Sequence, residues 1–332
     1  MTELPDRQQV LELMWGYRPA CVLGAAAELN LFTALGSQSL SAEQLAAKLA
    51  ADHRALAILL DAVAALGLLE KNEDRYSVPR ELRPLLVEDN PQSVLPMVWH
   101  SMSVLRAWSQ LAVVVKQGVP GPRQASIRGA EADRAAFVAA MHVVSGPLAD
   151  DLVARLGPLS FRHLLDVGGA SGTWTLAFLR AVPAATATIF DLPDAIRQAR
   201  QRLVGSDLAA RTELVAGDFY RDDLPAGADF AWVSAIAHQH SRSHNRELFA
   251  RVYAALEPGG RIAVRDFVME SNRTRPAEGA LFAVNMLANT DSGGTFTFEE
   301  FAADLAGAGF VDPKLLLSDG TMSSVVEARK PD

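Results

Sequence analysis

The chain of 332 residues is long enough for about two domains, each with its own core. Apolar residues make up 49% and charged residues 21%, which is ordinary globular composition and excludes a disordered or fibrous protein. The net charge of −8 excludes a chain-wide basic field of the kind that holds nucleic acid or anionic lipid. The single cysteine, Cys21, excludes an intramolecular disulfide framework and a cysteine-cluster zinc site.

The N-terminal sequence, MTELPDRQQV, has no basic leader followed by an apolar segment, so we expect no signal peptide. The most apolar helical stretch, residues 56–70, carries Asp61 in its middle and is too short to span a membrane. We therefore predict a cytoplasmic protein with no membrane partner.

The front half has helical apolar spacing from about residue 7 to residue 118. The pattern predicts a helix over 8–27 that is interrupted at 16–19. Ser41 and Gln44 form a capping box for a second helix, AEQLAAKLA. A third helix over 53–66 ends at Gly67, and two short strands follow around a charged turn at 72–74. Two helices followed by a hairpin predict a winged-helix domain.

The middle of the chain is predicted to be helical over 90–129 and again over 133–156. The Pro/Gly-rich run VPGPRQ, at 119–124, indicates a loop between domains. We therefore expect a helical, winged-helix dimerisation domain at 1–118, a linking segment and helix at 119–157, and a second domain at 158–332.

After Pro158 the pattern changes to strands that alternate with helices. Strands are predicted at HLLDVG, TATIFDL, TELVAGD, FAWVSAI and RIAVRDFV, with helices between them. This β-α-β order predicts an α/β domain with a doubly wound, mainly parallel sheet. The C-terminal segment predicts a helix followed by an antiparallel hairpin around a Ser-Asp-Gly turn.

The strongest chemical signal is the run LLDVGGASGT at 164–173, where a buried strand ends in a glycine-rich turn that opens a helix. Gly168, Gly169 and Gly172 allow a ligand to approach the backbone, and the helix N-terminus offers free N–H groups. Asp191, 19 residues beyond Gly172, ends the next strand, where a carboxylate suits ribose hydroxyls. This pair fits NAD as well as S-adenosylmethionine. The G-G-x-x-G spacing lacks the third glycine of the dinucleotide pattern and favours S-adenosylmethionine.

Further motifs follow on later strands: Gly217-Asp218-Phe219 after the third strand, and Glu257-Pro258-Gly259-Gly260-Arg261 before the fifth. Together with DVGGASG, FDLP and the terminal hairpin, they resemble the class I S-adenosylmethionine-dependent methyltransferases. The front half is similar to the dimerisation domain of the two-domain small-molecule O-methyltransferases, a group that includes caffeate-type and hydroxyindole enzymes. The resemblance covers nearly the whole chain.

This resemblance implies a seven-stranded, Rossmann-like sheet that binds S-adenosylmethionine across the carboxyl ends of its strands. Gly168 then faces the amino-acid part of the cofactor, Asp191 faces the ribose, and Asp218 and Phe219 face the adenine. Ser234 stands at a cofactor position where the family sometimes has Lys. The complete set of implied cofactor residues is Gly168, Gly169, Gly172, Asp191, Asp218, Phe219 and Ser234.

Methylation of a phenol requires a base near neutral pH, which favours histidine. The fourth strand runs into His238-Gln239-His240, where the family commonly has His-Asp-Trp with the histidine as general base. The resemblance therefore implies His238 as base and Asp266, on the following strand, as its acidic partner. A second acidic position of the family falls at about Thr295, which carries no carboxylate. O-methylation is thus favoured, and C- or N-methylation stays open.

The pattern His-x-His-x₃-His at His238, His240 and His244 also raises a metal-assisted reading, which Asp266 could complete. Such patterns in polar loops usually arise by chance, so no metal is expected.

Aromatic and Met side chains at helical spacing are candidates for an acceptor pocket, although such side chains usually belong to a core. Met141 and Met286 match family pocket positions, and Asn289 lies one turn beyond Met286. The wider set of candidates is Met97, Trp99, Met102, Phe137 and Phe282. We expect a small aromatic substrate.

A winged helix also raises DNA binding, but residues 1–90 carry 8 basic and 13 acidic side chains. The helix at 53–66 is apolar, with one Arg and one Asp, which suits burial against protein and not a phosphate backbone. A homodimer with no nucleic-acid partner is therefore expected. An NAD-linked oxidoreductase is the remaining alternative.

Overall fold

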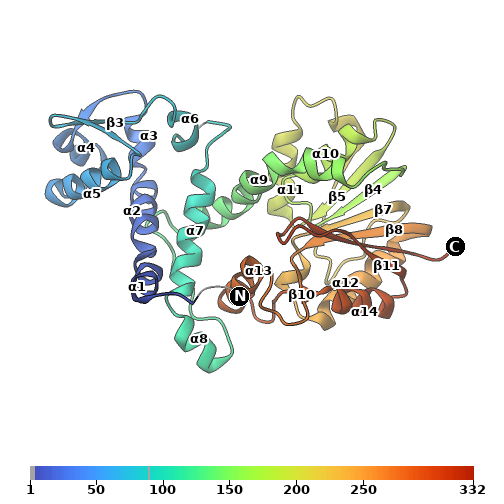
Figure 1. Ribbon diagram of the computed structural model, residues 1–332. Helices are drawn as coiled ribbons and strands as arrows, with labels where there is room; N and C mark the ends of the chain where they lie inside the picture. The colour runs from blue at the N-terminus through green and yellow to red at the C-terminus, as the bar shows by residue number, and fades with distance from the viewer. Residues whose placement is uncertain (1–3, 89) are drawn as a thin grey trace. The chain divides into compact units, whose positions relative to one another are not determined.

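The computed structural model describes residues 4–88 and 90–332 (Figure 1). Its contacts divide the chain into two compact units. Unit 1 contains the residues up to Arg106 together with Arg123–Val143, and unit 2 contains Ala107–Pro122 and Val144–Asp332. The chain therefore passes between the units more than once, and the boundaries expected at 118 and 157 stay a prediction.

Unit 1 is mainly helical. Its helices are α1 (Arg7–Trp15), α2 (Tyr17–Glu28), α3 (Leu31–Leu35), α4 (Ala42–Leu49), α5 (His53–Ala65), α6 (Arg83–Leu86) and most of α7 (Leu95–Trp108). A small antiparallel sheet has the order β1-β3-β2, from β1 (Leu40–Ser41), β2 (Glu70–Asn72) and β3 (Arg75–Ser77). The interruption after α1, the hairpin after α5 and the capping box of Ser41 and Gln44 are confirmed.

The helical prediction over 90–129 is wrong in its second part. Helices α7 and α8 (Leu111–Gln117) lie in this stretch, but residues 118–129 form no helix. The physical reason is the run from Gly118 to Pro122, because two prolines and two glycines remove backbone donors and favour turns.

Helix α9 (Ala130–Arg155) begins after this loop and contributes to both units. It is the one helix in the described parts of the chain that is long and apolar enough to cross a membrane. Long helices of protein cores and interfaces have the same length and composition, so α9 does not by itself indicate a membrane.

Unit 2 is built on a seven-stranded sheet with the order β11-β12-β8-β7-β4-β5-β6. Its strands are β4 (His163–Val167), β5 (Thr186–Asp191), β6 (Thr212–Ala216), β7 (Ala228–Ser234), β8 (Leu256–Asp266), β11 (Val311–Leu317) and β12 (Ser324–Arg329). Five neighbouring strands of this sheet run parallel, namely β6, β5, β4, β7 and β8. Strand β12 is antiparallel to both β8 and β11. The predicted doubly wound sheet and its terminal hairpin are confirmed.

Helices cover both faces of this sheet: α10 (Thr173–Ala181) and α11 (Pro193–Leu203) on one side, and α12 (Arg242–Ala255) and α14 (Phe298–Gly307) on the other (Figure 1). The remaining elements are α13 (Ala277–Asn289), the short parallel pair β9 (Val268–Met269) and β10 (Phe296–Thr297), and the 3-10 turns η1 (Ala209–Arg211) and η2 (Ala237–Gln239).

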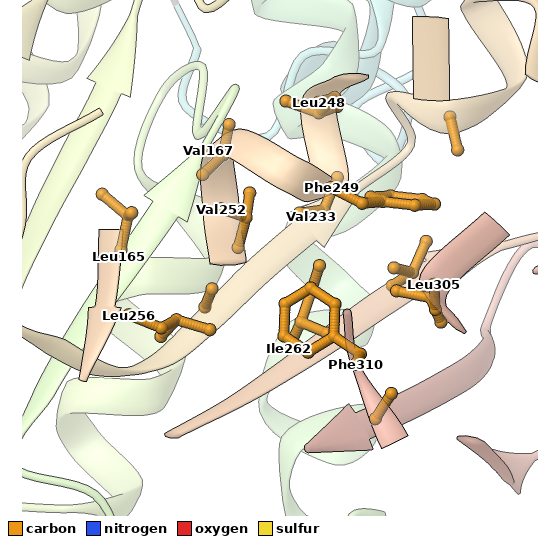
Figure 2. Close-up of a cluster of buried hydrophobic side chains, with 14 of the residues drawn as sticks. Leu165, Val167, Val233, Leu248, Phe249, Val252, Leu256, Ile262, Leu305 and Phe310 are labelled. Atoms are coloured by element: carbon orange, nitrogen blue, oxygen red, sulfur yellow. The ribbon is translucent and has the colours of Figure 1, made fainter. Parts of the chain in front are cut away.

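Two apolar cores hold these layers together. Figure 2 shows the core beneath α12 and α14, which is made by Leu165, Val167, Val233, Leu248, Phe249, Val252, Leu256, Ile262, Leu305 and Phe310. The opposite core is rich in rings, with Trp174, Phe178, Phe230 and Trp232 among its buried members. Truncating one such buried ring to Ala costs about 3–5 kcal/mol. The carboxyl ends of the parallel strands are therefore rigidly positioned.

Candidate active site

The glycine-rich turn between β4 and α10 needs residues in the left-handed region of φ. Gly168 has φ of 69° and Gly172 has φ of 77°, and Ala170 adopts φ of 46° between them. A Cβ on Gly168 would lie 2.5 Å from Cδ1 of Ile236, two residues before His238. The turn therefore packs directly against the segment that carries the predicted base.

Asp166, two residues before this turn, is buried on the side of the sheet that α10 covers. Its Oδ2 accepts a hydrogen bond of 2.6 Å from Oγ1 of Thr175, and Oδ1 has no hydrogen-bond partner among the described residues. Burial raises the pKa of Asp166 to about 7. The carboxyl thus anchors the start of α10 to the end of β4.

Asp191 lies at the end of β5 and reaches back to the same turn. Its Oδ2 accepts from the backbone N–H of Ala170 at 2.7 Å, and its Oδ1 accepts from that of Leu192 at 2.6 Å. Burial raises the pKa of this carboxyl. A carboxylate has about four acceptor positions, so each oxygen can accept a further hydrogen bond.

Asp218 and Phe219 follow β6 at the neighbouring strand end. Oδ1 of Asp218 accepts from the backbone N–H of Tyr220 at 3.0 Å. The ring of Phe219 lies 4.7 Å from that of Tyr220 and 5.9 Å from that of His240, measured between centroids. An aromatic cluster therefore lies between this strand end and the histidine segment.

His238 lies in η2, just after β7, and is buried together with Asp266 at the end of β8. Nδ1 of the imidazole is 2.9 Å from each carboxylate oxygen of Asp266, and the backbone N–H of His238 donates to Oδ2 at 3.1 Å. The ring of Phe282, from α13, meets the imidazole edge-on at 4.8 Å. A carboxylate held at Nδ1 fixes the proton there and leaves Nε2 as an acceptor.

The chain matches two families of domains, the O-methyltransferase domain over residues 117–311 and the O-methyltransferase dimerisation domain over residues 11–80. The tetracenomycin polyketide synthesis 8-O-methyl transferase TcmO of Streptomyces glaucescens is 30% identical over 97% of this chain and 96% of its own. The chain belongs to the O-methyltransferase family.

Solved structures agree with this assignment. The human N-acetylserotonin methyltransferase in complex with S-adenosylmethionine superposes with a TM-score of 0.80 at 24% identity, covering 100% of both chains. The N,N-8-amino-8-demethyl-D-riboflavin dimethyltransferase RosA of Streptomyces davawensis superposes with a TM-score of 0.81 at 26% identity, over 98% of this chain and 100% of its own. The S-adenosylmethionine in the first of these structures agrees with the cofactor that the spacing of the glycine turn favours.

The residues of the methyltransferase fit this cofactor chemically. The turn at Gly168 has a positive φ and no side chain of its own, and the N-terminus of α10 has no side-chain cap, so its N–H groups can meet a ligand. Asp191 keeps acceptor positions for hydroxyl groups, and Phe219 offers an aromatic surface beside Asp218. Two carboxylates also suit a ligand with a positively charged sulfonium. These roles stay predictions, as do those of Gly169 and Gly172 in the turn.

Ser234, which was predicted to contact the cofactor, is hydrogen-bonded to a buried arginine. Its hydroxyl accepts a hydrogen bond of 3.1 Å from Nη1 of Arg265, a buried residue of β8. The sequence reasoning missed Arg265. The available signal was a charged side chain inside the apolar strand RIAVRDFV.

The methyltransferase departs from the family pattern on each side of His238. Gln239 does not reach the imidazole, since its Nε2 donates to the backbone oxygen of Ala235 at 2.9 Å. Thr295 is buried without a carboxylate, in a loop whose Gly294 N–H donates to the backbone oxygen of His238 at 2.9 Å. Asp266 is thus the one acidic group hydrogen-bonded to the imidazole among the described side chains.

The other two histidines of the His-x-His-x₃-His pattern lie against Tyr220. Its ring centroid is 5.0 Å from that of His240 and 5.7 Å from that of His244. Burial, with smaller effects of His244 and His238, lowers the pKa of His240 to about 4. Within residues 4–88 and 90–332, no group of three His, Cys, Asp or Glu side chains is arranged to hold a metal ion.

The predicted acceptor residues fall in different units. Met141 lies in the part of α9 that belongs to unit 1, whereas Met286 and Asn289 lie on α13 in unit 2. Nδ2 of Asn289 donates to Oδ1 of Asn285, which also accepts from Nε1 of Trp108 at 2.9 Å. The acceptor roles of these three residues stay predictions.

Proposed function

We propose that this methyltransferase transfers a methyl group to a hydroxyl of a small aromatic molecule, with His238 as general base. The observation that carries this proposal is the buried His238–Asp266 pair at the carboxyl edge of the sheet, with Nδ1 to oxygen distances of 2.9 Å. The pair is adjacent to the glycine turn through Ile236.

The chemistry follows from which atoms remain available. Asp266 accepts a hydrogen bond from Nδ1–H, so the proton stays on Nδ1 and Nε2 carries the lone pair that can receive the proton of an acceptor hydroxyl. When bound, S-adenosylmethionine supplies the electrophilic methyl group. A well-placed base of this kind contributes roughly 10²- to 10⁴-fold to the rate.

An aromatic acceptor is supported by the surroundings of the imidazole. Phe282 meets His238 edge-on, and Phe267 lies 5.1 Å from Phe282 between ring centroids. Aromatic side chains favour edge-to-face and offset contacts with a further ring. The similarity to enzymes named for a polyketide and for N-acetylserotonin supports the same substrate class.

N-methylation is the second candidate, because the chain is also similar to RosA, an N,N-dimethyltransferase. An amine acceptor depends less on a general base, because its lone pair is already nucleophilic. The second acidic position of the family is Thr295 here, so His238 has one carboxylate partner fewer. Paired phenol and aniline analogues of one ring system separate the two reactions. Turnover of the aniline alone would favour N-methylation.

The test compares His238→Ala with the control His244→Ala, because His244 is exposed on α12. Each variant is given S-adenosylmethionine and a panel of naphthols, hydroxyindoles and hydroxyquinones, and methylated products are measured by mass spectrometry. We expect His238→Ala to lose at least 100-fold in turnover with its affinity for S-adenosylhomocysteine nearly unchanged. Equal turnover in both variants would remove His238 as base.

A homodimer is proposed from unit 1 on its own. Helix α1 buries none of its residues, and Leu13 and Met14 are 79% and 68% exposed. An exposed apolar helix within a dimerisation domain suits a second copy of the chain. Light scattering should give twice the chain mass, and Leu13→Glu should shift it toward the monomer. A monomeric wild type would contradict the proposal, and the cytoplasmic location stays a prediction.

A further inference from the structure

Arg265 is a charged side chain buried inside the sheet of unit 2. It is 2% exposed and is the penultimate residue of β8. Its guanidinium carbon lies 4.6 Å from the ring centroid of Trp174, and its Nη1 donates to Oγ of Ser234 at 3.1 Å. Burial lowers the pKa of Arg265 to about 10, so the side chain stays charged at neutral pH.

This charge has no direct carboxylate partner in the described parts of the chain. Its Nε is buried without a hydrogen bond, and no ion pair within 4.0 Å is formed. The two carboxylates whose fields reach it are engaged elsewhere: Asp266 holds His238, and Asp319 pairs with Arg155 at 3.2 Å. A buried charge without a partner is destabilising, and a contact with an aromatic ring offsets only part of that.

The position of Arg265 links it to the cofactor residues. Ser234 is its direct neighbour across the β7–β8 pair, at the carboxyl ends of both strands. In the next strand, β4 runs into the glycine turn that begins at Gly168, and Trp174 lies in the first turn of α10. The guanidinium therefore lies against the ring of a residue in the first turn of α10, and the free N–H groups of that turn also favour an anion.

We propose that Arg265 binds the α-carboxylate of S-adenosylmethionine and S-adenosylhomocysteine. The proposal rests on the cofactor assignment given above. Ser234, one of the predicted cofactor residues, is the hydrogen-bond partner of this guanidinium on the adjacent strand. The carboxylate would give the buried Nε of Arg265 an acceptor and the guanidinium a counter-charge at this strand end.

The test measures binding without any acceptor or turnover. Isothermal titration calorimetry compares S-adenosylmethionine with decarboxylated S-adenosylmethionine, which keeps the sulfonium and the amine. We expect Arg265→Met to weaken S-adenosylmethionine by roughly 10- to 100-fold, as loss of a charge-assisted hydrogen bond implies. Binding of the decarboxylated analogue should change less than about threefold, because that ligand has no carboxylate to lose.

The matched control is Arg261→Met, four residues earlier on the same face of β8, because Arg261 already pairs with Glu327 on β12. It should leave both affinities unchanged, and Arg265→Lys should recover part of the loss. Equal weakening of both ligands in a folded Arg265→Met protein would assign Arg265 a structural role and overturn the proposal. If Arg265→Met does not fold, the same comparison of the affinities for S-adenosylmethionine and decarboxylated S-adenosylmethionine is made with Arg265→Gln. A wild type that binds neither ligand would instead refute the cofactor assignment.

Discussion

Replacing Asp266 by Asn gives the sharpest test of how the catalytic pair is organised. Asp266 accepts three N–H groups: the imidazole Nδ1–H, the backbone N–H of His238 at 3.1 Å and that of Phe267 at 2.8 Å. These donors use both carboxylate oxygens. Asn has the same shape but only one acceptor oxygen, so in either orientation its NH₂ group faces a backbone donor.

The magnitude follows from this count. One buried backbone N–H loses its acceptor, which costs about 1–3 kcal/mol in the free energy of unfolding. The new NH₂ group also favours the imidazole tautomer with a lone pair on Nδ1 and the proton on Nε2. That tautomer of His238 cannot accept the proton of a hydroxyl. We therefore expect a loss of roughly 10²- to 10⁴-fold in methyl transfer.

The assay has two independent measurements. Single-turnover transfer from labelled S-adenosylmethionine reports the rate, and ¹⁵N NMR of labelled histidine reports which nitrogen of His238 carries the proton. The control is Asp291→Asn, in the exposed loop after α13. Retention of the Nδ1–H tautomer with a rate within threefold of wild type would refute the reasoning from the hydrogen-bond count.

Three further predictions concern stability. Since burial raises the pKa of Asp166 to about 7, its contribution to stability is full below about pH 4 and lost as the pH rises to about 7. Asp166→Asn should therefore melt at a higher temperature than wild type at pH 8 and gain nothing near pH 4; an equal gain at both would contradict this. Since burial lowers the pKa of His240 to about 4, stability is full above about pH 6.5 and falls with acid. His240→Phe should lose less stability between pH 7 and pH 5 in urea titrations, and parallel losses would count against it. Gly168→Ala combines positive φ with a 2.5 Å approach to Ile236, so it should destabilise the fold by about 1–3 kcal/mol in urea. An unchanged midpoint would show that the turn relaxes freely.

Much of unit 2 could be predicted because its signals are local. A buried strand, a glycine turn and an amphipathic helix follow one another along the chain, and their order determines the sheet. The pairing of His238 with Asp266 was expected from the family resemblance, and it forms because β7 and β8 are neighbours, which brings η2 beside the end of β8.

The features that could not be predicted depend on side chains meeting across elements. The sequence of β8 does not indicate that Arg265 contacts Ser234, because this contact depends on the register of β7 against β8. The ring of Phe282 against His238 depends on how α13 packs on η2. The Pro/Gly run at 119–124 was predicted as a loop and is one, but the helix expected over 90–129 was extended across it, and its end lies at Gln117.

Among the described residues, the hydrogen bonds to Asp266 come from His238 and Phe267, so the His238–Asp266 pair is held by the end of β8 and by η2, which follows β7. Helix α13 meets that pair through the ring of Phe282, while Asn285 accepts hydrogen bonds from both Asn289 and Trp108. Under the proposed function, proton transfer and acceptor selectivity therefore belong to separable parts of unit 2. Substitutions on α13 are then expected to change which acceptors are methylated while proton transfer is preserved, which makes this helix the place to begin in engineering the enzyme.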